Sequence, residues 1–261
     1  MNYSQAVSEF GDGIKIPKIP GEGFLLSSDG IFFSLQGEGL SIGQPAVFIR
    51  LHLCNLACDF RASGGGICDT SYTWDTSRKE YWTTHNTLSF KETFDEIKKY
   101  PCKRVVFTGG EPLIQQSLIA TFIRDYLPKE YIIEIETNGT ILPSKELLNI
   151  PKKIIFNCSP KLSAAGMDKK DCIKPHVLRF FNFYNSSVFK FVVTKLEDLV
   201  EIEEIVKECD LLPDKIMIMP EGVEVSILTK RLQELAEEVK KRGWSLTPRL
   251  QIFIWGNKRR T

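Results

Sequence analysis

Three cysteines lie within one short stretch of the chain, CNLACDFRASGGGICDTSYTW, at Cys54, Cys58 and Cys68. Closely spaced cysteines in a reducing compartment are typical of zinc or iron–sulfur sites. A structural zinc ion takes four ligands, and the nearest histidines, His52 and His85, do not supply a tidy second pair. A cube of four irons held by three thiolates leaves one iron open to a non-protein ligand. The spacing therefore favours a catalytic cluster, with zinc and unliganded buried cysteines as the alternatives.

The other cysteines stand alone in the sequence, and we expect each to be a packing residue: Cys102, Cys158, Cys172 and Cys209. An odd total of seven cysteines argues against a disulfide framework. His52 belongs to the apolar run LHLC, which is also typical of a buried side chain.

The composition is that of an ordinary globular chain. Of 261 residues, 43% are hydrophobic and 26% are charged, and the formal net charge is +1. This balance indicates neither nucleic-acid nor membrane binding. No apolar run is long enough to cross a membrane, and the N-terminus lacks the apolar core of a signal peptide, so we expect a cytoplasmic protein. We predict a single domain over residues 1–261, with a loosely ordered N-terminal extension over 1–28.

Short apolar runs rich in β-branched and aromatic residues alternate with segments of helical spacing. Nearly continuous apolar character predicts strands buried on both faces, as in parallel sheets. The predicted strands are PAVFIRL (45–51), RVVFTGGEP (104–112), YIIEIETNG (131–139), KIIFNCSPK (153–161), SVFKFVVT (187–194) and KIMIMPEG (215–222). The predicted helices cover residues 87–100, 111–127, 195–210 and 225–243. This alternation predicts an α/β fold with a parallel sheet.

Polar or glycine-rich residues follow each apolar run: CNLAC, TGGEP, ETNG, SPK and PEG. In a complete or partial β/α barrel, the loops after the strands lie on one face, and that face carries the chemistry. We therefore expect the functional residues to converge at the carboxyl ends of the strands.

The cysteine loop followed by TGGEP (108–112) resembles the radical S-adenosylmethionine (SAM) superfamily. Within it, SLQGEG, CDTSYTW (68–74) and RLQIFIWGNKR (249–259) resemble the 7-carboxy-7-deazaguanine synthase family, from about residue 30 to the end. The resemblance implies a modified, incomplete TIM-like (β/α) barrel. The superfamily pattern is C-x3-C-x2-C, whereas nine residues separate Cys58 from Cys68 here. Three successive glycines in this insertion would let the longer loop close on a cube.

The resemblance also implies a reaction. An electron enters the cluster, SAM is cleaved to a 5′-deoxyadenosyl radical, and the radical removes hydrogen from 6-carboxy-5,6,7,8-tetrahydropterin. The ring contracts and ammonia leaves, giving 7-carboxy-7-deazaguanine of the queuosine and deazapurine pathway. The implied cofactors are a 4Fe–4S cluster, SAM and Mg²⁺. The implied partners are an electron donor of the flavodoxin or ferredoxin type and a second copy of the chain.

Site residues follow from the same resemblance. It makes Cys54, Cys58 and Cys68 the cluster ligands and Thr70 a ligand of Mg²⁺. The implied substrate contacts are Leu35, Gln36, Gly37, Glu38, Arg50 and Thr108. The implied SAM contacts are Gly110, Glu136, Asn138, Ser159, Pro160, Lys161 and Lys190.

Several of these residues have a second interpretation. The SLQGEG and ETNG motifs also suit ordinary turns, and Thr70 suits a turn or cap. Arg50, at a buried strand end, needs a carboxylate partner, which is either the substrate or a protein Asp or Glu. Lys190 interrupts an apolar strand and marks either a site or a sheet edge. For the whole chain, the alternatives are a radical SAM activase that makes a glycyl radical on a partner protein, and a non-catalytic zinc module.

Overall fold

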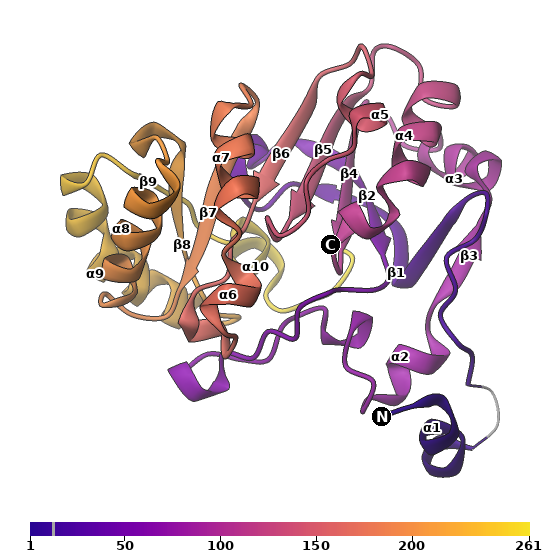
Figure 1. Cartoon of the computed structure of the whole chain (residues 1–261), viewed down its shortest axis with the longest axis horizontal. Coiled ribbons are helices and arrows are strands. Elements are labelled where there is room, and N and C mark those ends of the chain that lie inside the picture. Colours follow the sequence, from indigo (N-terminus) through magenta and orange to yellow (C-terminus); the bar gives the residue numbers. More distant parts are fainter. Residues whose placement is uncertain (12–13) are drawn as a thin grey trace.

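The computed structural model describes residues 1–11 and 14–261. In that part of the chain, nine strands form one sheet in the order β3-β1-β2-β4-β5-β6-β7-β8-β9 (Figure 1). The strands are β1 (Phe24–Leu35), β2 (Pro45–Leu51), β3 (Asn86–Leu88), β4 (Arg104–Gly109), β5 (Ile132–Thr137), β6 (Ile154–Cys158), β7 (Ser187–Val193), β8 (Ile216–Pro220) and β9 (Ser245–Leu246). Neighbours from β2 to β9 pair in parallel, and the sheet does not close, which confirms an α/β fold of the incomplete-barrel type.

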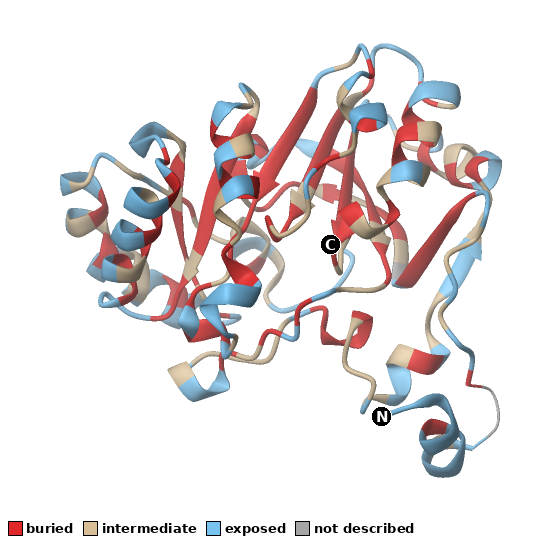
Figure 2. Cartoon of the chain, in the orientation of Figure 1, coloured by how far each residue is buried: buried red, intermediate tan, exposed pale blue. Residues whose placement is uncertain are grey.

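Helices connect most of the parallel strands. They are α1 (Tyr3–Phe10), α2 (Lys79–Thr83), α3 (Phe90–Ile97), α4 (Gln116–Asp125), α5 (Lys145–Leu148), α6 (Lys169–Cys172), α7 (Pro175–Phe183), α8 (Asp198–Cys209), α9 (Val225–Lys241) and α10 (Leu250–Trp255). Figure 2 shows buried strands and helices whose outward faces are exposed. None of the helices in the described ranges combines the length and apolar character needed to span a bilayer.

All six predicted strands are present, and β2 has the predicted bounds. The motifs TGGEP and ETNG begin inside β4 and β5 and continue into the loops that follow, and SPK begins directly after β6. Of the predicted helices, the segment over 87–100 divides into part of β3 and all of α3, because Ser89 and Glu92 form a capping box that begins the helix at Phe90.

Strand β1 was not predicted and runs antiparallel to β2. The connection between them, residues 36–44, is too short for a crossover helix, so a hairpin-like return is the available geometry. Because Leu35 pairs with Pro45 at the start of β2, the SLQGEG motif enters the sheet from the amino ends of the parallel strands. The prediction that all functional loops meet at the carboxyl ends is wrong for this motif.

Side chains alternate across the sheet and separate a packed face from a concave one. On the packed face, Phe107 contacts Phe122 of α4, and Phe156 contacts Phe181 of α7. On the concave face, polar residues occupy β2, β4, β5 and β7: Arg50, Thr108, Glu136 and Lys190. Because successive side chains of a strand point to opposite faces of the sheet, the polar row and the hydrophobic core lie on different faces.

The N-terminal region contains a capped helix where a loose segment was predicted. Asn2 and Gln5 form a capping box at α1, and Ala6 and Ile14 pack on Trp82 of α2. Strand β1 begins within the predicted extension 1–28, and positions 12 and 13 of that extension lie outside the described residues.

Candidate active site

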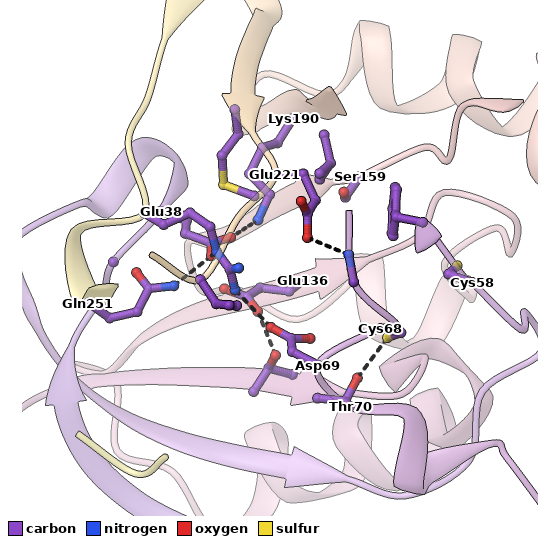
Figure 3. A pocket seen from close by; sticks show the side chains of 18 of the residues that line it. Glu38, Cys58, Cys68, Asp69, Thr70, Glu136, Ser159, Lys190, Glu221 and Gln251 are labelled. Carbon is purple, nitrogen blue, oxygen red and sulfur yellow. Dashed lines mark hydrogen bonds and ion pairs between the residues drawn. The ribbon is translucent and has the colours of Figure 1, made fainter. Parts of the chain in front are cut away.

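The concave face of the sheet encloses a cavity of about 460 Å³. Its walls come from β2, β4, β5 and β7, from the cysteine loop, from the SLQGEG turn and from the C-terminal segment (Figure 3). The predicted site residues that line it are Leu35, Gln36, Gly37, Glu38, Arg50, Cys54, Cys58, Cys68, Thr70, Thr108, Gly110, Glu136, Asn138, Ser159, Lys161 and Lys190. Pro160 is the predicted site residue that does not line it.

The three clustered cysteines share the cavity wall, and all are free thiols. Burial raises the pKa of Cys54 to about 11 and that of Cys58 to about 12, while the charge of Lys161 opposes both shifts. Iron binds thiolates, so loading a cluster onto these residues releases protons. The remaining cysteines, Cys102, Cys158, Cys172 and Cys209, are buried and do not line the cavity.

The donor set fits a cube better than a single metal ion. Within the described ranges, no three His, Cys, Asp or Glu side chains are grouped to hold one metal ion. In a cube, each thiolate binds a different iron, so the cysteines surround a volume instead of converging on a point. His52 is buried against Tyr81 and His85, and its pKa is lowered to about 3, chiefly by burial.

A tight turn brings the TGGEP motif against the cysteine loop. A Cβ atom on Gly110 would lie 1.9 Å from the carbonyl oxygen of Leu53, the residue before Cys54. Leu53 has a left-handed φ of 78°, and its carbonyl accepts a hydrogen bond of 2.8 Å from the amide of Glu111. Glycine at position 110 is therefore required by close backbone approach.

Glu111 joins the TGGEP turn to the ETNG loop. Its carboxylate accepts hydrogen bonds from the Leu113 amide at 3.0 Å, the Thr137 hydroxyl at 2.8 Å and the Asn138 amide at 2.7 Å. Burial raises the pKa of Glu111. The Asn138 side chain donates in turn to the side chain of Asn55 at 2.9 Å. The TGGEP turn, the ETNG loop and the cysteine loop are thus cross-linked, which is typical of a pre-organised site.

The SPK segment adds two polar groups to the same wall. The Ser159 amide donates to the Thr137 carbonyl at 2.7 Å, and Lys161 Nζ donates to Ser159 Oγ at 2.9 Å.

Thr70 lies close to the third cysteine. Its hydroxyl donates to the Gly109 carbonyl at 3.1 Å and is 3.4 Å from Cys68 Sγ.

Gln36 is held by two carboxylates. Its Nε2 donates to Glu134 at 2.9 Å and to Glu136 at 3.0 Å, and its Oε1 accepts from the Glu38 amide at 3.2 Å. Arg104 forms a buried ion pair with Glu134 at 3.2 Å. The amide of Gln36 is thus engaged inside the protein, which indicates that this side chain orients the turn.

Glu38 lies among basic side chains on the cavity wall. It forms ion pairs with Lys190 and, at 3.2 Å, with Arg249, and it accepts from Gln251 at 2.7 Å (Figure 3). Burial favours the neutral acid, but the charges of Lys190 and Arg249 outweigh it and lower the pKa of Glu38. Lys190 lies on β7, between β6 and β8, so the interpretation of Lys190 as an edge residue is wrong.

Arg50 and Thr108 are register partners on β2 and β4. The guanidinium carbon of Arg50 lies 5.2 Å from the ring centre of Phe32, and the residue faces the cavity. Thr108 donates to Glu136 at 2.5 Å. A cation, a hydroxyl and a carboxylate therefore occupy adjacent strands of the concave face.

Sequence reasoning missed several residues of the cavity wall: Asp69, Glu221, Arg231, Arg249 and Gln251. It also missed Glu111, which is buried behind the wall and braces two of its loops. Two of the missed wall residues, Arg249 and Gln251, lie at the start of the RLQIFIWGNKR motif. That motif was therefore a sequence signal for this part of the site, but it did not show which of its side chains face the cavity. Glu221 follows β8 in the PEG segment. The sequence predicts a polar loop there but does not single out the Glu221 carboxylate. Arg231 is one of many charged residues on α9, and nothing in the local pattern separates it from the rest.

An incomplete β/α barrel with three free cysteines beside a TGGEP turn is the arrangement of a radical SAM enzyme. No model of a known protein family matches the chain. The chain is 32% identical to 7-carboxy-7-deazaguanine synthase of Pyrobaculum aerophilum over 88% of this chain and 94% of that protein. It therefore belongs to the 7-carboxy-7-deazaguanine synthase family.

Other relatives with the same name agree with this assignment. The protein of Rhodopirellula baltica is 32% identical, covering 92% of this chain and 90% of its own. That of Aquifex aeolicus is 31% identical, covering 83% and 87%. The crystal structure of QueE from Escherichia coli matches with a TM-score of 0.57 and 21% identity, over 87% of this chain and 93% of that one. This last likeness supports the fold.

Proposed function

We propose that this chain is a 7-carboxy-7-deazaguanine synthase, a radical SAM lyase that contracts the ring of 6-carboxy-5,6,7,8-tetrahydropterin with loss of ammonia. The observation that carries the proposal is the convergence on one cavity of the three cysteines and the SLQGEG turn, which approach from opposite ends of the strands. Enzymes of this family use a 4Fe–4S cluster, SAM and Mg²⁺.

The residues that would bind the cofactors lie mainly at the carboxyl ends of the strands. Cys54, Cys58 and Cys68 would hold the cluster, and Thr70 would contribute to Mg²⁺ binding. The groups that would contact SAM are the main chain at Gly110 and the side chains of Glu136, Asn138, Ser159, Lys161 and Lys190. Pro160, predicted with them, lies between Ser159 and Lys161 and does not line the cavity. When bound, the cluster and SAM supply the radical chemistry that removes a hydrogen atom from the substrate.

The substrate would bind between Arg50 and the SLQGEG turn. Arg50 would hold the substrate carboxylate, as a guanidinium can do in a bidentate manner, and Thr108 would donate or accept beside it. Glu38 would accept from the amino edge of the pterin, in an electrostatic setting that keeps this carboxylate charged. Leu35 and Gly37 would add main-chain contacts, while Gln36 orients the turn through its hydrogen bonds to Glu134 and Glu136 of β5.

The remaining parts of the proposal concern the setting of the enzyme. We place it in the cytoplasm as a homodimer, and we expect a flavodoxin- or ferredoxin-type electron donor, because the cluster must be reduced before SAM is cleaved. No observation on the described residues favours a glycyl-radical activase or a zinc module as a second candidate.

The test is anaerobic incubation of the iron-reconstituted protein with a reductant, SAM, Mg²⁺ and 6-carboxy-5,6,7,8-tetrahydropterin. The expected product is 7-carboxy-7-deazaguanine, detected by mass spectrometry, and the matched control is the Cys68→Ala protein. A cluster-replete protein that cleaves SAM but never forms the deazapurine would reject the synthase assignment.

A further inference from the structure

The insertion between the second and third cysteines folds into a small hairpin. Asp59 and Ile67 form an antiparallel bridge, and the Phe60 amide donates to the Gly66 carbonyl at 2.9 Å. At the base of the hairpin, the Cys68 amide donates to the Cys58 carbonyl at 3.3 Å. The insertion is therefore a defined element that begins and ends at a cysteine of the cavity wall.

Two charged side chains hold the tip of this hairpin. The Gly66 amide donates to Glu221 Oε1 at 3.2 Å, and Arg231 Nη2 donates to the Gly64 carbonyl at 3.1 Å. Arg231 also pairs with Glu221 at 2.9 Å, with side chains only 16% and 13% exposed. A mostly buried, charge-assisted contact of this kind fixes a loop more firmly than surface hydrogen bonds do.

The contact joins distant parts of the sheet. The hairpin follows β2, whereas Glu221 follows β8 and Arg231 lies on α9, and four strands separate β2 from β8. In Figure 3, the Glu221 side chain points toward the loop that carries Cys68 and is joined to it by a hydrogen bond. The hairpin contributes five wall residues to the cavity: Phe60, Gly64, Gly65, Gly66 and Ile67. It thus covers part of the cavity at the carboxyl ends of the strands.

The glycines explain how the hairpin backbone comes so close to the Glu221 carboxylate. A Cβ atom on Gly65 would lie 2.8 Å from Glu221 Oε2 and 2.8 Å from the Cβ of Phe60. A Cβ atom on Gly66 would meet Glu221 only at 3.8 Å, which is ordinary contact. Position 65 therefore requires glycine for the contact with Glu221, while position 66 tolerates alanine.

We propose that Glu221 and Arg231 are positioning residues that latch the 59–67 hairpin across the cavity, fixing Cys68 and closing the cluster side against solvent. The latch itself stands on the contacts above. The shielding of a cluster rests on the proposed function. Neither residue is assigned a contact with substrate or with the reacting atoms.

The first test is limited trypsin cleavage after Arg61, which lies at the exposed start of the hairpin turn. Cleavage tracks the population of the opened loop when opening is fast. We expect Gly65→Ala to raise the rate of cleavage at this site by about tenfold, the factor that the loss of one charge-assisted hydrogen bond produces. Gly66→Ala is the matched control and should stay within about twofold of the parent.

The second test breaks the latch from its other side. Arg231→Met should raise the same cleavage rate, whereas Arg242→Met, which removes an arginine paired with Glu238 on the same helix, should not. Urea unfolding of all variants shows whether the fold as a whole has changed. Cleavage rates equal to the parent in both Gly65→Ala and Arg231→Met would overturn the latch.

Cluster shielding has a readout that does not need turnover. In anaerobically reconstituted protein exposed to air, the visible absorbance of the cluster should bleach several-fold faster in Arg231→Met than in Arg242→Met. Equal bleaching rates would overturn the shielding. A parent protein that binds no cluster would instead reject the proposed function, and the trypsin result would still decide on the latch.

Discussion

Glu38 shows how neighbours decide what one carboxylate can do. It is mostly buried, which by itself favours the neutral acid, yet Lys190 and Arg249 keep it ionised. The consequence is a fixed negative charge on the cavity wall that can accept hydrogen bonds at any physiological pH. The cysteines show the opposite case, because burial holds Cys54 and Cys58 in the neutral thiol form until a metal replaces their protons.

Ionisation of Glu38 makes a pH-dependent contribution to stability. A lowered carboxyl pKa stabilises the fold above the ordinary value of 4.5, and this stabilisation is lost as the pH falls through the lowered value. Glu38→Gln removes the ion-pair partner of buried Lys190 and one of the two partners of Arg249, which keeps Asp69. We therefore expect a loss of about 3–5 kcal/mol in the free energy of unfolding at pH 7. The difference from the parent should shrink below pH 4.5, as measured by urea unfolding of the cluster-free protein.

The matched control for this substitution is Glu96→Gln, which removes a partly exposed partner of Lys99. We expect it to cost at most about 1 kcal/mol at either pH. A Glu38→Gln protein as stable as the parent at pH 7 would show that the ion pairs around Glu38 do not contribute to folding.

The assignment of ligands among the cysteines is a second prediction at the residue scale. Replacing Cys54, Cys58 or Cys68 singly by Ala should remove most of the bound iron, since each would leave one iron of a cube without a protein ligand. Cys102→Ala, Cys172→Ala and Cys209→Ala should keep the iron content of the parent, because these cysteines do not line the cavity. Iron analysis after anaerobic reconstitution makes the comparison. Full iron content in Cys58→Ala would remove that residue from the ligand set.

At the scale of elements, apolar periodicity was a reliable guide to the parallel strands, because both faces of β2 and β4 to β8 are covered. It failed for β1, whose sequence FLLSSDGIFFSL is broken by a polar centre where the register with β2 shifts between Leu26 and Ile31. That strand reverses direction, so it also decides where SLQGEG lies. Motif resemblance named many of the polar residues of the cavity wall, but it could not supply the pairings within it.

Those pairings join residues far apart in the chain. Glu38 meets Lys190 and Arg249 across separations of 152 and 211 residues, and Gly66 meets Glu221 across 155. Such contacts depend on the order of strands in the sheet and on the path of the C-terminal segment. Local sequence carries neither, and this is why Arg231 and the role of the glycine tract emerged only from the structure.

The tight turn at Gly110 makes a prediction about the elements it joins. In Gly110→Ala, the new Cβ would collide with the Leu53 carbonyl at 1.9 Å, and backbone on both sides leaves no flexible group to yield. The TGGEP turn must then separate from the cysteine loop. We expect SAM affinity to fall by at least about tenfold, because a 1 Å misplacement of positioning groups can cost up to about 100-fold in rate.

Calorimetry on the anaerobic, cluster-loaded protein measures this affinity. Gly21→Ala is the matched control, because a Cβ there meets no atom within 4 Å. SAM binding by Gly110→Ala as tight as that of Gly21→Ala would show that the two elements need not touch for SAM to bind.

For the molecule as a whole, the cavity has two ends, and we propose that one binds the cofactors and the other the substrate. The cysteine loop and the TGGEP, ETNG and SPK segments lie at the carboxyl ends of the strands, whereas the SLQGEG turn enters from the amino ends and meets β5 and β7 on the concave face. Arg50, at the sixth position of β2, stands between the two groups. A substrate bound there would contact both the turn and the cofactor side.

This division predicts that substrate binding and SAM chemistry can be separated by one substitution. In Arg50→Ala, the carboxylated pterin loses its proposed cationic partner, and deleting one member of a desolvated charge pair costs about 2–5 kcal/mol, or roughly 30-fold or more in affinity. Cleavage of SAM without substrate should stay close to the parent rate, because the cysteines and the Gly110 turn are untouched. Calorimetry with the pterin and an uncoupled cleavage assay, both on anaerobic SAM-loaded protein, measure the two effects. Pterin binding unchanged by the substitution would reject the role given to Arg50, whereas absence of pterin binding in the parent would reject the synthase itself.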